Sequence, residues 1–363
     1  MPNVCNNAML CWRNFLLALL LGRQAFGLFL SSSTSPSTRT IENPIVICPG
    51  FGNDQIDYVE PLQQPREVGL VSVLQRRGVQ NVHIVPVARA DWIRVAGGLL
   101  DVPAFYTNQA LPTGRGYGWY LQRLKDTVNA AYEASGGRKV ILLGHSAGGW
   151  LARAAMGNGV WENDTGDAVV RTADRICCLT TVGAIHRPPV NTGTCVTRGA
   201  LAYTDREYPG AFLADQGIAY VTVGGNAIQG NDSTKEDPLT TQADRVYAVR
   251  GEGSQARVAY TSYKAVCGNG YTTGDGVVPL EWTQLPGAKH LTLDGVLHSI
   301  NEAGTTLPTD RWYGSEGVID RWLPTVLQEA GIIQTSTNTL NGFGLVNGLQ
   351  QWATNAQKAL LSR

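Results

Sequence analysis

The most constraining stretch of the sequence runs from Val140 to Gly149 and reads Val-Ile-Leu-Leu-Gly-His-Ser-Ala-Gly-Gly. Its apolar residues predict a buried strand, and Gly144 and Gly148 flank Ser146 with the spacing G-x-S-x-G. In so tight a turn from strand to helix, a β-carbon at either glycine would collide with neighbouring backbone. Good helix formers follow at 150–156. The stretch therefore predicts a nucleophile elbow that exposes Ser146 at its tip.

The remaining chain predicts one large α/β domain over residues 42–333. Six runs are apolar throughout and lack the apolar–polar alternation of half-buried strands. Such unbroken runs are typical of parallel strands that are covered on both faces. Helical patterns lie between them and after the last. The expected fold is a doubly wound, mostly parallel sheet. The strands are expected at 45–48, 82–86, 139–143, 176–182, 218–223 and 290–293, and helices at 68–77, 117–134, after Ser146, and at 316–330.

A glycine-rich loop after the first expected strand is the second chemical landmark, reading Cys48-Pro-Gly-Phe-Gly-Asn53. Acyl transfer builds negative charge on the carbonyl oxygen, and two fixed backbone N–H groups stabilise that charge. We expect these donors to be Phe51 and Ala147, the residue after the serine. The alternative is an ordinary strand-to-helix turn. A phosphate loop is excluded here, because no Gly-Lys-Ser/Thr follows.

A nucleophilic serine needs a base, and His298 is the preferred histidine of the five. It follows the last expected strand and precedes polar residues, which predicts a loop at the same sheet edge as Ser146. His186 and His290 remain the alternatives, while His145 lies inside the elbow and is expected to pack away from the serine.

The acid that orients the base should fall between the serine and the histidine in the chain. Asp275 lies between Gly274 and Gly276 in a loop that can carry its carboxylate to the imidazole. Asp294 competes with it, but falls within the last expected strand, where a solvated turn residue is the usual reading.

Gly-His-Ser-Ala-Gly-Gly and Gly-Asp-Gly-Val-Val-Pro are similar to segments of α/β-hydrolases of the lipase-like serine esterase type. Pro-Gly-Phe-Gly-Asn and Gly-Val-Leu-His-Ser resemble a plant, algal and cyanobacterial group, distantly similar to the inositol deacylases of GPI anchors. The resemblance implies a Ser146, Asp275, His298 triad that hydrolyses a carboxylic ester through an acyl-enzyme. One departure is Pro49-Gly50, where many members have His-Gly.

The expected substrate is a lipophilic ester, with a plastid lipid preferred. Chlorophyll comes second, because chlorophyllases usually carry a residue larger than Ala147 after the serine. An acyltransferase uses the same serine chemistry but excludes water. A catalytically inactive binding protein would normally have lost a triad member.

Two segments, 187–217 and 226–274, are expected to be cap insertions. Their aromatic residues either line an acyl pocket or simply cover the sheet. The tail, 334–363, places Leu345, Leu349, Trp352 and Leu360 at helical spacing. This amphipathic helix would dock on the domain or make peripheral contact with a membrane.

Residues 1–41 predict a targeting leader. They hold three arginines and no acidic residue, and the apolar run at 15–21 is too short to span a bilayer. A Ser-rich, acid-poor stretch follows, so a signal peptide is joined to a transit peptide. Ala25-Phe26 between them resembles the cleavage motif of proteins that enter secondary plastids. We expect a plastid location, with secretion as the alternative.

Charge and cysteine content exclude several classes of function. Basic and acidic residues number 29 each, so nothing indicates nucleic-acid binding. The five cysteines beyond the leader lack CxxC spacing, which indicates neither a metal site nor a disulfide framework. Cys195 and Cys267 form the one pair whose bonding stays open. We expect a monomer that needs no metal or cofactor.

Overall fold

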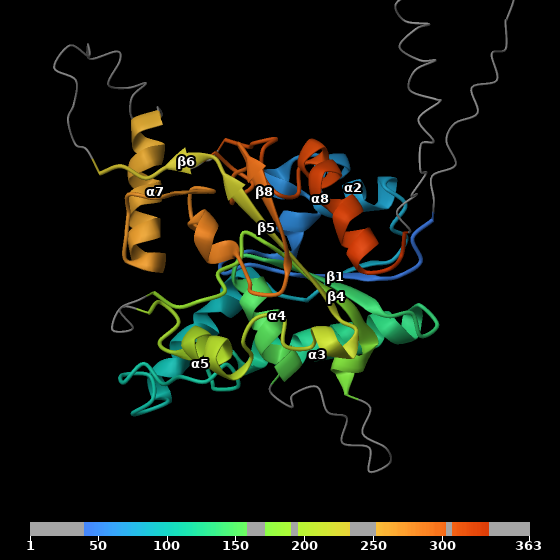
Figure 1. Ribbon diagram of the computed structural model, residues 1–363, viewed down its shortest axis with the longest axis horizontal. Coiled ribbons are helices and arrows are strands. Elements are labelled where there is room, and N and C mark those ends of the chain that lie inside the picture. The colour runs from blue at the N-terminus through green and yellow to red at the C-terminus, as the bar shows by residue number, and fades with distance from the viewer. Residues whose placement is uncertain (1–39, 158–170, 190–194, 233–251, 303–306, 334–363) are drawn as a thin grey trace, which may run out of the picture. The chain divides into compact units, whose positions relative to one another are not determined.

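A six-stranded parallel sheet forms the centre of the fold in the computed structural model (Figure 1). The structure describes residues 40–157, 171–189, 195–232, 252–302 and 307–333, all within one unit, Arg39–Arg363. The strand order is β2-β1-β3-β4-β5-β8, and each neighbouring pair is parallel. The strands are β1 (Ile45–Cys48), β2 (Val82–Ile84), β3 (Val140–His145), β4 (Ile176–Val182), β5 (Ala219–Asn226) and β8 (Lys289–Asp294).

Each central strand is apolar throughout because both of its faces are buried. In β1, Val46 and Cys48 belong to the hydrophobic core on one side of the sheet, whereas Ile45 and Ile47 belong to the core on the other side. Successive side chains of a strand point to opposite faces, so a strand between two cores needs an unbroken apolar run. All six predicted strands are present, two of them with the predicted ends and the other four with ends that differ by at most three residues.

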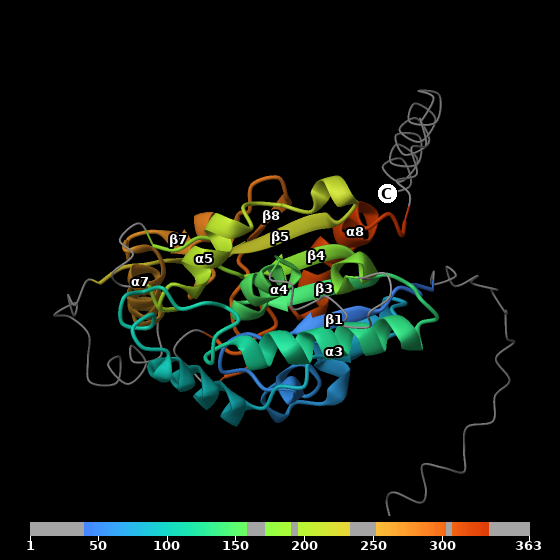
Figure 2. The same ribbon diagram turned by 90° about the horizontal axis from the view of Figure 1, so that it is seen from below.

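Helices cover both faces of the sheet. α2 (Leu70–Arg76) and α8 (Glu316–Glu329) lie on one side, and α3 (Gly118–Ala134) and α4 (Ala147–Gly157) lie on the other (Figure 1). Figure 2 is seen from below, with α3 and α4 lying over strands β1, β3 and β4. All four helices were predicted within two or three residues of their observed ends. The expected fold class, an α/β-hydrolase fold with a doubly wound sheet, is confirmed.

The two predicted insertions contain regular structure that the sequence patterns did not indicate. In the first, α5 (Ala200–Glu207) buries Ala200 and Leu201 in the same core as α3 and α4. In the second, α7 (Glu252–Cys267) lies beside β6 (Ile228–Gln229) (Figure 1). β6 pairs antiparallel with β7 (Thr273–Gly274). β7 ends immediately before Asp275.

The predicted leader and tail fall outside the described residues, apart from positions 40 and 41. Within the part of the chain that the structure describes, none of the helices combines the length and the apolar character needed to span a bilayer.

Candidate active site

Ser146 occupies the sharp turn between β3 and α4. Its φ angle is 51°, a left-handed conformation that typically costs a non-glycine residue about 1–3 kcal/mol. The neighbouring backbone holds this conformation, because the Ser146 N–H donates to the carbonyl of Val182 at 3.0 Å and the Ser146 carbonyl accepts from Gly149 at 3.0 Å. The strand, the turn and the helix that the sequence predicts are therefore all present.

The two glycines of the turn are required by close backbone contacts. A β-carbon on Gly144 would lie 2.4 Å from the Cα of Gly149, and one on Gly148 would lie 2.1 Å from the carbonyl oxygen of Cys48. Neither backbone atom can move aside as a flexible side chain could. The elbow is thus packed directly against the end of β1, where the glycine-rich loop begins.

Asp275 and His298 form a buried pair at the same edge of the sheet. The Asp275 side chain follows β7 and is 1% exposed, and His298 follows β8 and is 6% exposed. His298 Nδ1 lies 2.7 Å from Asp275 Oδ2, and the His298 backbone N–H donates to the Asp275 carbonyl at 2.9 Å. An ionised carboxylate can only accept, so Nδ1 carries the proton and Nε2 is left with a free lone pair.

Three further donors hold the Asp275 carboxylate. Oδ1 accepts from the backbone N–H groups of Val277 at 3.0 Å and Val278 at 2.7 Å. Oδ2 accepts from the hydroxyl of Tyr313 at 2.8 Å, and the Tyr313 oxygen in turn accepts from the N–H of Gly225 at 2.7 Å. Burial, followed by the charge of Asp275, raises the pKa of Tyr313 well above its usual range. Tyr313 therefore remains a protonated donor, and sequence reasoning did not identify it.

Ser146 lies beside this pair but is not hydrogen-bonded to His298 in the described part of the chain. The end of β4 lies between them: Val182 binds the serine backbone, and a β-carbon on Gly183 would lie 2.8 Å from Asp275 Oδ2 and 2.9 Å from His298 Nδ1. Catalytic hydrogen bonds are often long in a site without substrate and tighten on binding. The three predicted residues thus gather at one edge of the sheet.

The expected oxyanion donors are accessible as backbone groups. Ala147 opens α4, where first-turn N–H groups lack a helical acceptor. Within the described ranges, neither the N–H of Ala147 nor that of Phe51 donates to another residue. The loop of Phe51 is close to the serine, since a β-carbon on Gly50 would lie 2.8 Å from Ser146 Cβ.

The competing residues have other partners. His186 is buried and bonds through Nε2 to Thr181 Oγ1 at 2.9 Å, and its burial lowers its pKa well below the usual range. His290 bonds to Thr222 Oγ1 at 2.8 Å. Asp294 is exposed at the end of β8, where its Oδ1 accepts from Asn226 at 3.2 Å. Among the residues that the structure describes, Asp275 with His298 is the one histidine–carboxylate ion pair.

An apolar cavity of about 240 Å³ opens at Ser146. Its lining is mostly hydrophobic, and comprises Val95, Tyr117, Trp150, Ile185, Val196, Val266, Val277 and Val278 together with Phe51, Ala147 and Thr197. A second cavity of about 170 Å³ shares Val95, Tyr117, Val196 and Thr197 with the first, and extends toward Phe105. Apolar space therefore continues beyond the first cavity, away from the serine.

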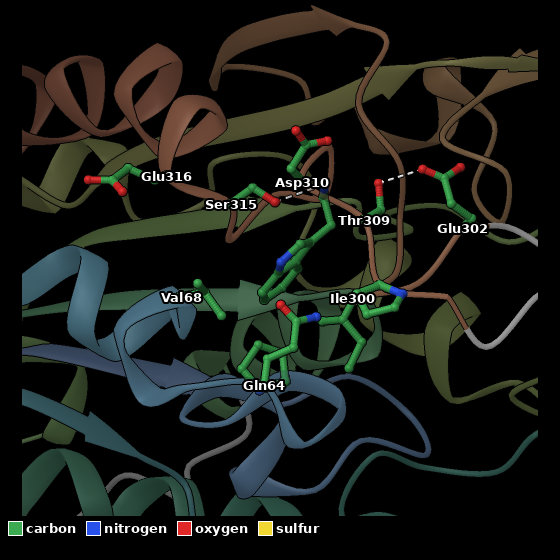
Figure 3. A pocket seen from close by; sticks show the side chains of 11 residues that line it. Gln64, Val68, Ile300, Glu302, Thr309, Asp310, Ser315 and Glu316 are labelled. Carbon is green, nitrogen blue, oxygen red and sulfur yellow. Dashed lines mark hydrogen bonds between the residues drawn. The ribbon is translucent and has the colours of Figure 1, made fainter. Parts of the chain in front are cut away.

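A separate cleft of about 450 Å³ lies between the chain segments at 61–68 and 300–316 (Figure 3). Its acidic residues are Glu302, Asp310 and Glu316. Glu302 forms an ion pair with Arg311, and Glu316 forms ion pairs with Arg76 and Arg77. Figure 3 marks the bond that Thr309 donates to Glu302 at 2.7 Å. Among the described residues, no histidine lines this cleft, so its one lining serine, Ser315, has no imidazole base there of the kind that serine acyl transfer uses.

The described ranges contain neither a disulfide nor a group of side chains arranged to bind a metal. Cys48, Cys177, Cys178, Cys195 and Cys267 are free thiols, so Cys195 and Cys267 do not pair. No group of three or more His, Cys, Asp or Glu side chains in these ranges is placed to hold a metal ion.

Comparison with known proteins gives structural neighbours only. No protein-family model and no curated protein sequence matches the chain. A lipase from Bacillus licheniformis in its mature form is 14% identical, with a TM-score of 0.44 over 78% of this chain and 91% of the lipase. The Staphylococcus hyicus lipase is 12% identical, with a TM-score of 0.40 over 80% of this chain and 97% of that one. A metagenomic carboxyl esterase is 12% identical, with a TM-score of 0.38 over 82% of each chain.

Proposed function

We propose that the chain is a serine-dependent carboxylic-ester hydrolase that acts on a lipophilic ester. The observation that carries this proposal is the buried Asp275–His298 pair, placed at the same sheet edge as a strained elbow serine that opens into an apolar cavity. A buried carboxylate that fixes one nitrogen of an imidazole is the arrangement that general-base activation of a serine needs.

In the proposed reaction, His298 Nε2 takes the proton of the Ser146 hydroxyl as its oxygen attacks the ester carbonyl. Asp275 holds the tautomer that leaves Nε2 free and stabilises the imidazolium that forms. The imidazolium then protonates the departing alcohol, leaving an acyl-enzyme. Water, activated by the same nitrogen, releases the acid and restores the serine.

The backbone N–H groups of Phe51 and Ala147 are proposed to bind the oxyanion. Both groups have no acceptor among the described residues, and both belong to segments packed against Ser146. Fixed donors of this kind typically contribute about 3 kcal/mol each to transition-state stabilisation. Since they are backbone groups, the departure to Pro49-Gly50 leaves the donor of Phe51 intact.

A lipophilic acyl group fits the apolar lining. Burying a chain gains about 0.8 kcal/mol per methylene, so kcat/KM should rise with chain length while the chain remains inside the two adjoining cavities. A series of p-nitrophenyl esters from acetate to palmitate measures this. Preference for acetate would indicate a small-molecule esterase instead.

The direct test of the nucleophile is labelling with a fluorophosphonate probe. We expect wild type to be labelled and Ser146→Ala to be unlabelled, with ester hydrolysis reduced by roughly a million-fold. Ser135→Ala, which removes a hydroxyl at the far end of α3, is the matched control and should behave as wild type. Equal labelling of Ser146→Ala and wild type would refute the assignment of Ser146.

The same chemistry also allows the acyl group to be transferred from the serine to an alcohol rather than to water. Product analysis with and without an alcohol acceptor separates the two. Release of the free acid in the absence of an acceptor supports hydrolysis, and dependence on the acceptor identifies a transferase.

We also propose that the protein reaches a plastid and makes peripheral contact with lipid there. The proposed plastid location rests on the sequence of residues 1–41, of which positions 1–39 lie outside the described residues. Exposed apolar side chains near the cavities, including Ile93, Leu100, Val102 and Tyr106, support the lipid contact. A fluorescent fusion of residues 1–41 in a diatom-like host tests the address, and secretion of that fusion would overturn it.

A further inference from the structure

A buried chain of hydrogen bonds connects the glycine-rich loop to the loop of His298. The N–H of Gly50 lies 3.0 Å from the Tyr58 hydroxyl, this hydroxyl lies 2.9 Å from His145 Nδ1, and His145 Nε2 lies 3.0 Å from the carbonyl oxygen of His298. Tyr58 is 1% exposed and His145 is 3% exposed. The chain therefore passes through the elbow by way of the residue before Ser146.

The two ends of this chain fix the direction of every proton in it. A backbone N–H can only donate and a backbone carbonyl can only accept. The Tyr58 oxygen therefore accepts from Gly50, and its own proton goes to His145 Nδ1. His145 must then carry its proton on Nε2 and donate it to His298. A neutral ring in this one tautomer satisfies every member of the chain.

The surroundings keep the His145 ring neutral. Burial, followed by the proximity of His298, lowers the pKa of His145 to about 3. The Trp312 ring packs at centroid distances of 6.0 Å from His145 and 6.3 Å from Tyr58. The other titratable groups facing His145 are Asp275 and Tyr313, and Asp275 is already paired with His298.

We propose that Tyr58 and His145 are positioning residues, which hold the loop carrying the Phe51 donor and the loop carrying the His298 base at a fixed spacing on either side of Ser146. Gly50 immediately precedes Phe51, so the bond to Tyr58 holds the backbone next to that donor. The bond from His145 holds the backbone of the base itself. A neutral His145 also avoids charge repulsion when His298, with its ring centroid 5.1 Å away, becomes an imidazolium.

This inference rests on the proposed function, and Tyr58→Phe compared with Tyr120→Phe tests it. Tyr120 is the matched control, because it is equally buried and its hydroxyl also bonds to the glycine-rich loop, donating to Pro49 at 2.9 Å. Tyr120 is not part of the chain through His145. We expect Tyr58→Phe to lower kcat roughly tenfold with little change in KM, and Tyr120→Phe to keep kcat within about twofold of wild type.

The second measurement does not depend on activity. ¹⁵N NMR of labelled imidazoles should show wild-type His145 as a single neutral Nε2–H tautomer from about pH 5 to 8, and the same in Ser146→Ala and Tyr120→Phe. In Tyr58→Phe the Nε2–H tautomer should persist, because the His298 carbonyl still accepts its proton, but the Nδ1 resonance should shift, because Nδ1 no longer accepts a hydrogen bond.

The outcomes separate failure of this inference from failure of the proposed function. If the esterase proposal is wrong, hydrolysis is absent while the His145 tautomer persists. Equal kcat in the two tyrosine variants, or a mixed tautomer in wild type, would refute the positioning role. If Tyr58→Phe folds poorly, kcat is calculated per molecule that reacts with the fluorophosphonate probe. The tautomer of His145 in wild type still tests the proposed hydrogen-bond directions without this variant.

Discussion

Removing the Tyr313 hydroxyl tests how the Asp275 carboxylate is held. Tyr313→Phe deletes one donor to Asp275 Oδ2 and leaves the N–H of Gly225 buried without an acceptor. A hydrogen bond to a charged group contributes about 1.5–3 kcal/mol, and an orphaned buried N–H costs about 1–3 kcal/mol. The expected loss in the free energy of unfolding is therefore about 4 kcal/mol, which leaves a typical domain folded but marginal.

Tyr263 provides a matched control for this change. It is also fully buried, its oxygen accepts from the N–H of Gly276 at 2.8 Å, and its hydroxyl donates to the backbone carbonyl of Ile228 at 3.0 Å. Tyr263→Phe thus orphans the same kind of backbone group but loses only a neutral bond, of about 0.5–1.5 kcal/mol. We expect it to be less damaging than Tyr313→Phe by about 1 kcal/mol or more.

The assay is urea unfolding of both variants, combined with kcat measured on the folded fraction. Tyr313→Phe should also lower kcat by roughly tenfold, because the carboxylate that orients His298 loses a fixed partner. Tyr263→Phe should keep the kcat of wild type. Equal losses of stability with unchanged kcat in both variants would show that Tyr313 does not position Asp275.

Three further results are expected. Gly148→Ala should fail to fold, because its β-carbon would lie 2.1 Å from the β1 backbone. The control, Gly317→Ala, places its β-carbon in open space and should remain soluble. Soluble expression of both variants would contradict the packing of the elbow. Val95→Phe, which narrows both cavities, should lower kcat/KM for palmitate more than for acetate, and parallel losses would mean that the acyl chain lies elsewhere. His145 and His186 have pKa values lowered by burial, so below about pH 6.5 the unfolded chain takes up protons that the folded chain does not. The free energy of unfolding, measured by urea titration, should therefore fall as the pH is lowered from about 6.5 to 5, by up to about 1.4 kcal/mol per pH unit for each histidine. A flat profile would refute this linkage.

Patterns that depend on local geometry predicted most of the framework. The six sheet strands could be recognised because strands between two cores must be apolar on both faces. The elbow could be recognised because close backbone contact at Gly144 and Gly148 restricts both positions to glycine. Glycines beside Asp275 and the chain order of serine, acid and base likewise led to the buried Asp275–His298 pair.

The missed features depend on contacts that no local pattern encodes. Tyr58 and Tyr313 are single tyrosines far from Ser146 in sequence, and only the folded chain brings their hydroxyls to His145 and Asp275. α7 escaped prediction because it contains Gly253, two serines, one threonine and two β-branched valines, which are weak helix formers. Its burial of Ala259 and Tyr263 against Ile228 of β6 and Leu297 supplies stability that helix propensity does not.

The order of the strands has a consequence for the growing chain. β8 is the last strand in sequence and pairs only with β5 at the edge of the sheet, and the base and the tyrosine that holds the acid follow it at His298 and Tyr313. Contacts so distant in sequence carry the entropic cost of closing a long loop, and these residues are synthesised well after the elbow. A nascent chain that has just made its elbow therefore displays a serine without a base. On the proposed function, ester hydrolysis would begin only once nearly the whole described chain has been synthesised.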